Sequence, residues 1–209
     1  MNLSEPADVV MPRTTAAVLR VLAGADAAFS IRQAARLAGV SAARALEIVD
    51  HAHERGLVLV EQAGRARMCR LNRDHLAAEA IVALVTLRRR MFDVLEQELA
   101  SWDVAPVHAT LFGSAARGDG TATSDLDILV IREDNAPESP WAEQLYRSGW
   151  RLRTVTGNPV SWFDLSVGEL RQAADNEEPV LADWKSEGVL LAGRPLDDVL
   201  GRRRRRPAG

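Results

Sequence analysis

The sequence is poor in cysteine, in lysine and in long apolar runs. Its 209 residues include one cysteine, Cys69, and one lysine, Lys185, among 26 basic residues. A single cysteine cannot form an internal disulfide, which is typical of proteins in a reducing cytoplasm. No apolar run approaches the roughly 18 to 20 residues of a membrane-spanning helix. The acidic start MNLSEPADVV lacks the basic and then apolar layout of a signal peptide. These absences predict a cytoplasmic protein without a membrane anchor.

The overall composition is that of a folded globular protein. A hydrophobic content of 47% with 26% charged residues leaves room for one large or two small domains. The net charge of −3 argues against indiscriminate nucleic-acid binding. Five consecutive arginines occupy positions 202–206, so residues 201–209 are predicted to form a disordered, solvated tail.

The most informative stretch of the chain is LFGSAARGDGTATSDLDILVI. Residues 107–112 predict a buried strand that ends at Gly113 and Ser114. A glycine at this place lets the backbone turn sharply and approach a ligand closely. Free backbone N–H groups at the start of the next predicted helix, together with the Ser114 hydroxyl, suit phosphate oxygens. The stretch is therefore predicted to bind a phosphate group.

Two aspartates, Asp125 and Asp127, open the next predicted strand, DLDILVI. Residues two apart on a strand share a face, so both carboxylates point to the same side. The two carboxylates repel each other unless a cation lies between them, and hard oxygen ligands favour Mg²⁺ or Mn²⁺. A phosphate site and a metal site this close together predict that the ligand is a nucleoside triphosphate with its metal.

The combined pattern resembles the signature of nucleotidyltransferases with the DNA polymerase beta-like fold. Among these it is most similar to the minimal nucleotidyltransferases, some of which are antitoxin-type protein modifiers. The resemblance covers about residues 104–195 and is carried by Gly113, Ser114, Ala116, Arg117, Gly118, Ser124, Asp125 and Asp127. It implies two-metal transfer of a nucleoside monophosphate, with ATP as the expected donor. By resemblance, both aspartates would hold the metals. Nucleotide contacts would come from Gly113, Ser114, Arg117 and Ser124, unless Arg117 simply faces solvent.

The resemblance also implies a third carboxylate on a later strand, which would bind the catalytic metal. In the predicted strand 159–165 this acid would fall on Ser161, whereas Asp164 lies three residues further on. Ser161 and Phe163 share one face of the strand, and Trp162 and Asp164 share the other. Only one face can look at the metals, and the sequence alone does not fix which. We take Asp164 as the candidate third catalytic residue, its alternative role being to cap the following helix.

Residues 13–73 resemble the winged helix-turn-helix of bacterial transcription regulators. The segment predicts three helices, each with serine or threonine at its start and glycine at its end. A hairpin with a Gly-bearing turn follows them. Arg44 on the third helix and Arg65 and Arg67 on the wing are the candidate DNA contacts. Three acidic residues on the third helix oppose the approach of phosphate. The alternative is therefore that this module packs on a partner or dimerises.

The remaining segments complete the predicted architecture. Residues 74–102 have apolar residues at helical spacing and predict a long linking helix, which also offers a homodimer interface. Residues 103–200 predict a small mixed sheet with helices. The fold class is thus α/β (α+β), with an N-terminal winged helix-turn-helix, a linking helix and a C-terminal nucleotidyltransferase domain.

Two functions are consistent with this arrangement. The first is a Mg²⁺-dependent nucleotidyltransferase that modifies a hydroxyl of a small molecule or of a protein, such as a toxin partner in a toxin–antitoxin setting. An RNA 3′ end or an antibiotic hydroxyl are further acceptors. The alternative is a DNA-binding transcription regulator whose nucleotidyltransferase domain senses a nucleotide or a partner. We rank the enzyme first.

Overall fold

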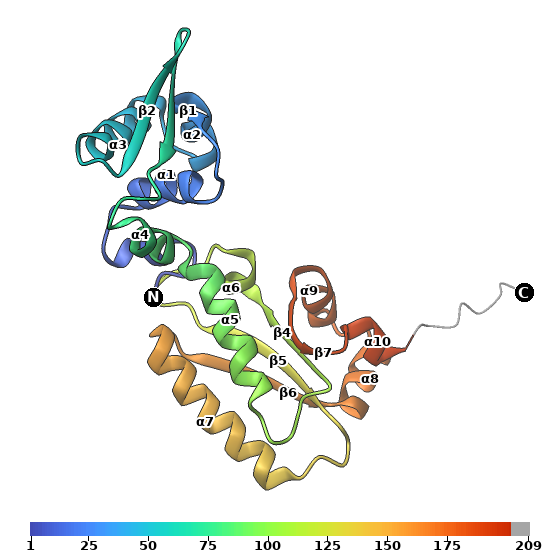
Figure 1. Ribbon diagram of the computed structural model, residues 1–209. Coiled ribbons are helices and arrows are strands. Elements are labelled where there is room, and N and C mark those ends of the chain that lie inside the picture. The colour runs from blue at the N-terminus through green and yellow to red at the C-terminus, as the bar shows by residue number, and fades with distance from the viewer. Residues whose placement is uncertain (202–209) are drawn as a thin grey trace, which may run out of the picture. The chain divides into compact units, whose positions relative to one another are not determined.

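The chain forms two compact units, each with a small sheet and several helices. The computed structural model describes residues 1–201, so the predicted arginine run at 202–206 lies outside the described residues. One unit comprises Asn2 and Ser4–Arg90, and the other comprises Met1, Leu3 and the chain from Met91 onward. The mixed α/β class is confirmed (Figure 1). Within residues 1–201, no helix is long and apolar enough to cross a membrane.

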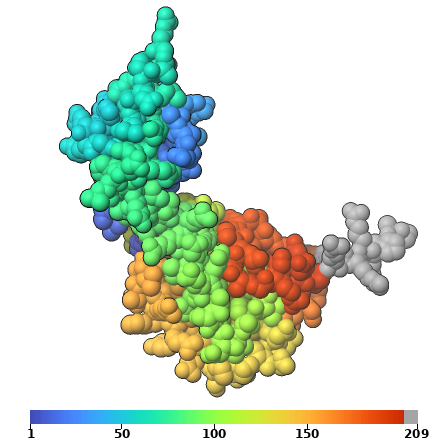
Figure 2. All heavy atoms as spheres, in the orientation of Figure 1, coloured from blue at the N-terminus to red at the C-terminus, as the bar shows by residue number. Residues whose placement is uncertain are grey.

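The N-terminal unit has the element order of a winged helix, three helices and a two-stranded wing. Its elements are the 3-10 helix η1 (Pro6–Val9), α1 (Arg13–Ala23), β1 (Phe29–Ser30), α2 (Ile31–Ala38), α3 (Ala42–Glu54), β2 (Val58–Ala63), β3 (Ala66–Leu71) and α4 (Ala78–Val85). The strands pair antiparallel in the order β1-β3-β2. The β2–β3 hairpin turns at Gly64, and its tip projects from the body of the unit (Figure 2).

Two of the three predicted N-terminal caps are present in this unit, whereas α1 begins after Pro12 and no side chain caps it, so the serine or threonine cap predicted for the first helix is wrong. The Ser30 side chain accepts from the backbone of Gln33, whose own side chain reaches back to Ser30, which makes a capping box at the start of α2. Gly39 ends α2 with φ +66, the left-handed conformation that glycine adopts at little cost. The Ser41 hydroxyl accepts from Arg44 N at 3.2 Å and starts α3. These caps fix the limits of the helix-turn-helix.

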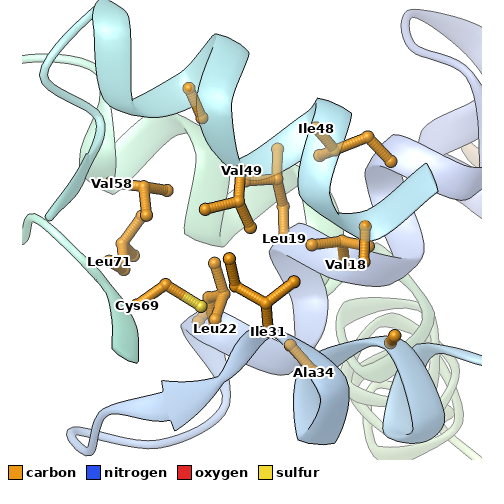
Figure 3. Packing of buried hydrophobic residues seen from close by; sticks show 14 of the residues in the cluster. Val18, Leu19, Leu22, Ile31, Ala34, Ile48, Val49, Val58, Cys69 and Leu71 are labelled. Carbon is orange, nitrogen blue, oxygen red and sulfur yellow. The ribbon is translucent and has the colours of Figure 1, made fainter. Parts of the chain in front are cut away.

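An apolar core holds the winged helix together. Val18, Leu22, Val49 and Cys69 are fully buried, and they pack with the neighbouring apolar side chains shown in Figure 3. The Cys69 thiol donates to Phe29 O at 3.3 Å, and burial raises the pKa of this thiol. Cys69 is therefore a core residue rather than a reactive thiolate.

The prediction of a single helix over residues 74–102 is wrong. The structure divides it into α4, which ends at Val85, and α5 (Leu87–Ala100), with Thr86 between them. The Thr86 hydroxyl donates to Val82 O at 2.7 Å and competes with the backbone for this carbonyl. Moreover, α4 belongs to the N-terminal unit and most of α5 to the C-terminal unit.

The C-terminal unit is built on a four-stranded sheet in the order β6-β5-β4-β7. Its further elements are β4 (His108–Phe112), α6 (Gly113–Arg117), β5 (Leu126–Arg132), α7 (Glu138–Thr156), β6 (Val160–Ser166), α8 (Val167–Asp175), α9 (Val180–Glu187), β7 (Val189–Gly193) and α10 (Leu196–Leu200). β5 and β6 are parallel, whereas β4 runs antiparallel to β5 and to β7. The sheet is thus mixed, as predicted.

Helices cover both faces of this sheet. Leu126, Ile128 and Val130 of β5 pack in one cluster with buried residues of α5 and α7. Leu129 and Ile131 point to the opposite face and pack with residues of α8, α9 and α10. The fully buried Leu3, from the start of the chain, joins the first cluster. Odd-numbered residues of β5 therefore face α8 and α9, which decides the side on which Asp127 lies.

Candidate active site

The two predicted metal-binding carboxylates lie at the start of β5. Asp127 is the second residue of the strand and pairs in register with Phe112, the last residue of β4. Gly113 follows with φ +66, and a Cβ atom added to it would lie only 2.7 Å from Asp127 Oδ2. Glycine is therefore required at this turn for two reasons, its left-handed backbone and the carboxylate that lies against its Cα. Asp125 lies two residues before Asp127 and is likewise partly buried.

The electrostatics of this pair favour a cation. Burial raises the pKa of Asp127, the negative charge of Asp125 raises it further, and Arg117 opposes both effects. Residues 1–201 contain no cluster of three or more His, Cys, Asp or Glu side chains that could hold a metal. Two carboxylates fit Mg²⁺ or Mn²⁺ when phosphate oxygens and water complete the ligand shell. The donor set therefore suits an ion that arrives with a nucleotide.

The segment between Ser114 and Asp125 is held by its own hydrogen bonds. Ser114 O accepts from the backbone N–H groups of Gly118, Asp119 and Gly120 at 3.0–3.1 Å. The Ser124 hydroxyl accepts from Thr121 N at 2.9 Å, so Ser124 shapes the turn that precedes Asp125. By contrast, the Ser114 hydroxyl makes no hydrogen bond to any residue that the structure describes. Of the two serines, Ser114 is the one free to bind a phosphate oxygen.

The strand register corrects the prediction for Asp164. Ser161 pairs with Asp127 and shares its face, whereas Asp164 pairs with Val130 on the opposite face. There Asp164 accepts from Trp141 Nε1 at 3.0 Å and lies 3.4 Å from Arg132 Nε. Asp164 therefore cannot join the aspartate pair.

Ser161 lies in register with Asp127 and on the same face of the sheet. Its hydroxyl donates to Asp125 Oδ2 at 3.0 Å and so orients that carboxylate. Alternation along the strand places Ser161 and Asp164 on opposite faces, and only the register of β6 on β5 shows that Ser161, not the predicted Asp164, shares the face of Asp127.

Part of the chain is similar to known proteins. Residues 90–188 match the family model described as nucleotidyltransferase domain. None of the curated proteins matches the chain. A crystal structure of a MarR family transcriptional regulator from Silicibacter pomeroyi DSS-3 is similar at 28% identity, over 47% of this chain and 69% of that chain, with a TM-score of 0.35. The nucleotidyltransferase match includes the aspartate pair, Gly113 and Ser114.

Near the aspartate pair, Arg117 is engaged by acidic residues. It forms ion pairs with Asp119 at 3.2 Å and with Glu187 of α9 at 2.5 Å, and these partners raise the pKa of its guanidinium. Arg117 therefore ties α6 to α9.

The predicted DNA contacts of the winged helix differ in their surroundings. Arg44 is paired with Glu47 at 2.9 Å and donates to Thr14 Oγ1 at 3.2 Å. Arg67 is paired with Asp50 at 2.5 Å. Arg65 is exposed at the hairpin tip and has no partner among the described residues. The acidic residues noticed in the sequence thus engage two of the three arginines, and of the three only Arg65 has no ion pair within the described residues.

Proposed function

We propose that the nucleotidyltransferase domain binds a nucleoside triphosphate with its divalent metal and transfers the nucleoside monophosphate to an acceptor hydroxyl. ATP is the expected donor, and the acceptor belongs to a small molecule or to a protein such as a toxin partner. The observation that carries the proposal is the contact between Gly113 and Asp127, with Asp125 two residues earlier. This turn brings a phosphate-binding backbone and a pair of carboxylates to one point.

The residues of the chain have separate roles in this proposal. Asp125 and Asp127 would hold Mg²⁺ or Mn²⁺, which when bound neutralises phosphate charge and lowers the pKa of the acceptor hydroxyl. The Ser114 hydroxyl binds a phosphate oxygen, and Gly113 lets the backbone come close to the triphosphate. Ser161 keeps Asp125 in place through the bond of 3.0 Å between Ser161 Oγ and Asp125 Oδ2.

Transfer of label from nucleotides carrying α-phosphate label tests the proposal. The purified protein would be incubated with Mg²⁺, each of the four ribonucleotides in turn, and cell lysate. The double variant Asp125→Ala/Asp127→Ala should lose transfer, because it lacks both metal ligands. Asp164→Asn is the matched control: it keeps the bond from Trp141 on the other face and should transfer normally. Undiminished transfer by the double variant would refute the proposal.

A second function is favoured by Ser161, which pairs in register with Asp127 and on which the family resemblance would place the third carboxylate. A two-carboxylate site can bind a metal–nucleotide without efficient transfer. In that case the winged helix would act as a DNA-binding regulator that responds to nucleotide.

Fluorescence anisotropy with the DNA upstream of the coding sequence, with and without Mg²⁺-ATP, tests this second function. Arg65→Ala should weaken binding and reduce its salt dependence. Arg70→Ala, an exposed arginine on β3, is a control for the loss of positive charge. Equal binding to random duplex would exclude a specific regulator.

A further inference from the structure

The outer side of α7 carries two large aromatic side chains that the fold leaves exposed to water. Tyr146 is 79% exposed and Trp150 is 68% exposed. They are four positions apart and therefore lie on one side of the helix. The other tryptophans of this unit are buried or half-buried. Adjacent exposed aromatic side chains are typical of a surface that binds another protein.

Two opposite charges flank the aromatic pair. Glu143 comes three positions before Tyr146, and Arg153 comes three positions after Trp150, so the four side chains form a stripe along α7. Glu143 and Arg153 are exposed, and neither forms an ion pair with any residue in the described part of the chain. They are about 15 Å apart along the helix axis, whereas ion pairs within one helix join residues three or four positions apart. The two other arginines of α7, by contrast, pair with acidic residues of the same unit.

The stripe is complementary to a second copy of itself. From either end it runs charge, aromatic, aromatic, opposite charge, with the same spacings of three, four and three positions. In a two-fold interface, each residue contacts its counterpart across the axis, and every contact occurs twice. Two α7 helices that pack antiparallel about an axis at residue 148 place Tyr146 against Trp150 of the second copy. The same axis places Glu143 against Arg153 of the second copy. A two-fold pair therefore gives every side chain of the stripe a partner.

A hollow beside the stripe can receive the aromatic rings of a second copy. Its volume is about 270 Å³, and residues of α7 and β6 line it. Gly149 of α7 contributes no side chain to this lining, and an added Cβ there would lie 3.1 Å from Trp162 Nε1. Tyr146 and Trp150 also line the hollow. The projecting rings and the hollow that admits them thus belong to one surface, which is what a two-fold interface requires.

We propose that this stripe, formed by Glu143, Tyr146, Trp150 and Arg153, is the interface through which two copies of the chain form a two-fold dimer. α7 has 19 residues and is about 28 Å long, which is enough for two copies of it to pack side by side. The two exposed rings offer roughly 300 Å² per copy, about a third of the roughly 800 Å² that each partner buries in a typical stable interface. The dimer contact then lies on α7, outside the segment 74–102 that the sequence predicted.

The proposed interface is separate from the nucleotide site. α7 packs with Leu126 and Ile128 on one face of the sheet, whereas Asp127 lies on the other face. Dimer formation therefore goes beyond the proposed function, and the two can fail independently.

Exchanged charges test the contact, with sedimentation velocity of the full chain at several concentrations giving the Kd of the dimer. Glu143→Arg brings two arginines together at each end of the interface, and Arg153→Glu brings two glutamates together there. Each variant alone should dimerise about tenfold more weakly, or worse. An equal mixture of the two variants should form a mixed dimer with a Kd near that of the unaltered protein, because opposite charges face each other again. The double variant Glu143→Arg/Arg153→Glu should dimerise normally for the same reason.

Further variants test the aromatic pair and provide the control. Tyr146→Ala/Trp150→Ala should weaken the dimer by about tenfold or more. Glu177→Arg makes the same change of charge at an exposed position after α8, on the other side of the sheet, and should dimerise normally. Circular dichroism shows whether each variant is folded, and calorimetry should give an unchanged Kd for Mg²⁺-ATP.

Three outcomes would overturn the proposal. The first is a monomer at about 0.1 mM, because an interface of this size binds with a micromolar Kd or tighter. The second is a dimer that both charge variants leave unchanged, which would assign dimerisation to another surface. The third is a weakened dimer that the mixture does not restore, which would show a general effect of charge. Restoration in the mixture supports the proposal, because a nucleobase or a different protein bound to the stripe would not need matched charges from two copies.

Discussion

Replacing Gly113 by alanine should impair nucleotide binding far more than it impairs folding. Gly113 and Gly39 both have φ +66, but they differ in what an added Cβ atom would meet. At Gly113 it would lie 2.7 Å from Asp127 Oδ2, whereas at Gly39 nothing lies within 4 Å. The two alanine variants therefore share one backbone penalty, and only Gly113→Ala displaces the carboxylate.

The expected magnitudes follow from these distances. A non-glycine residue in the left-handed region costs about 1–2 kcal/mol, partly offset by about 0.4–1 kcal/mol from the less flexible unfolded chain. Each variant should thus lower the free energy of unfolding of its own unit by about 1 kcal/mol. A carbon and an oxygen in ordinary contact are roughly 3.4 Å apart, so the Asp127 carboxylate must move by about 0.7 Å. Misplacement of a catalytic group on this scale lowers the rate of the catalysed reaction by about 10- to 100-fold.

The assay compares both variants with the unaltered protein. Urea unfolding followed by circular dichroism gives the stability of each variant, and calorimetry gives the Kd of Mg²⁺-ATP. Gly113→Ala should weaken Mg²⁺-ATP binding and lower the rate of label transfer by about tenfold or more, and Gly39→Ala should leave both unchanged. Equal nucleotide affinity in the two variants, at comparable loss of stability, would refute the assignment of the Gly113–Asp127 contact to the nucleotide site.

Three further predictions concern single side chains. Ser161→Asp adds a third carboxylate in register with Asp127, so it should tighten Mg²⁺ binding and raise the rate of label transfer by about tenfold. Ser161→Ala is the control. An unchanged rate in Ser161→Asp would show that a missing carboxylate does not limit transfer. Because the folded-state pKa of Asp127 is raised, its protonated form stabilises the fold, and this stability is lost as pH rises through the folded pKa. In EDTA, Asp127→Asn should therefore be more stable than the unaltered protein at pH 7, and urea titrations should show the difference in unfolding free energy shrinking towards pH 4. A difference that does not change with pH would contradict the assignment of this stability to the ionisation of Asp127. Glu177 has φ +54, a backbone conformation that glycine adopts at less cost. Glu177→Gly should therefore stabilise the protein by about 0.5–1 kcal/mol in urea unfolding. A loss of stability would mean that the Glu177 side chain contributes more than its left-handed backbone conformation costs.

Local sequence signals predicted the parts of the structure that depend on neighbouring residues. Ser30 and Ser41 start helices as expected, because each cap bonds to a backbone N–H only three residues away. Asp127 lies on the strand after the Gly113 turn as expected, because the alternation of side chains along a strand needs no distant partner. The third acid could not be predicted in this way. Its assignment depended on the register of β6 against β5, which is set by packing across the whole sheet.

The same limit applies to the linking helix and to the DNA contacts. Apolar spacing cannot show that the Thr86 hydroxyl bonds to Val82 and interrupts the helix. Likewise, the side chains of Asp50 and Arg67 are 17 positions apart in the chain, and only the folded hairpin brings them together. Acidic residues on the third helix were visible in the sequence, but their pairing with these arginines was not.

The burial of Leu3 has a consequence for truncation experiments. Leu3 packs in the core of the C-terminal unit, where an added Cβ on Gly120 would lie 3.0 Å from Leu3 Cβ. The winged helix is thus topologically an insertion, entered after the third residue and left near Met91. A fragment that starts at residue 91 would lack Leu3 and leave a hole beneath the loop between Ser114 and Asp125, at a cost of about 2–5 kcal/mol. Loss of nucleotide binding in such a fragment would be explained by the missing leucine and would not by itself show that the winged helix communicates with the nucleotide site.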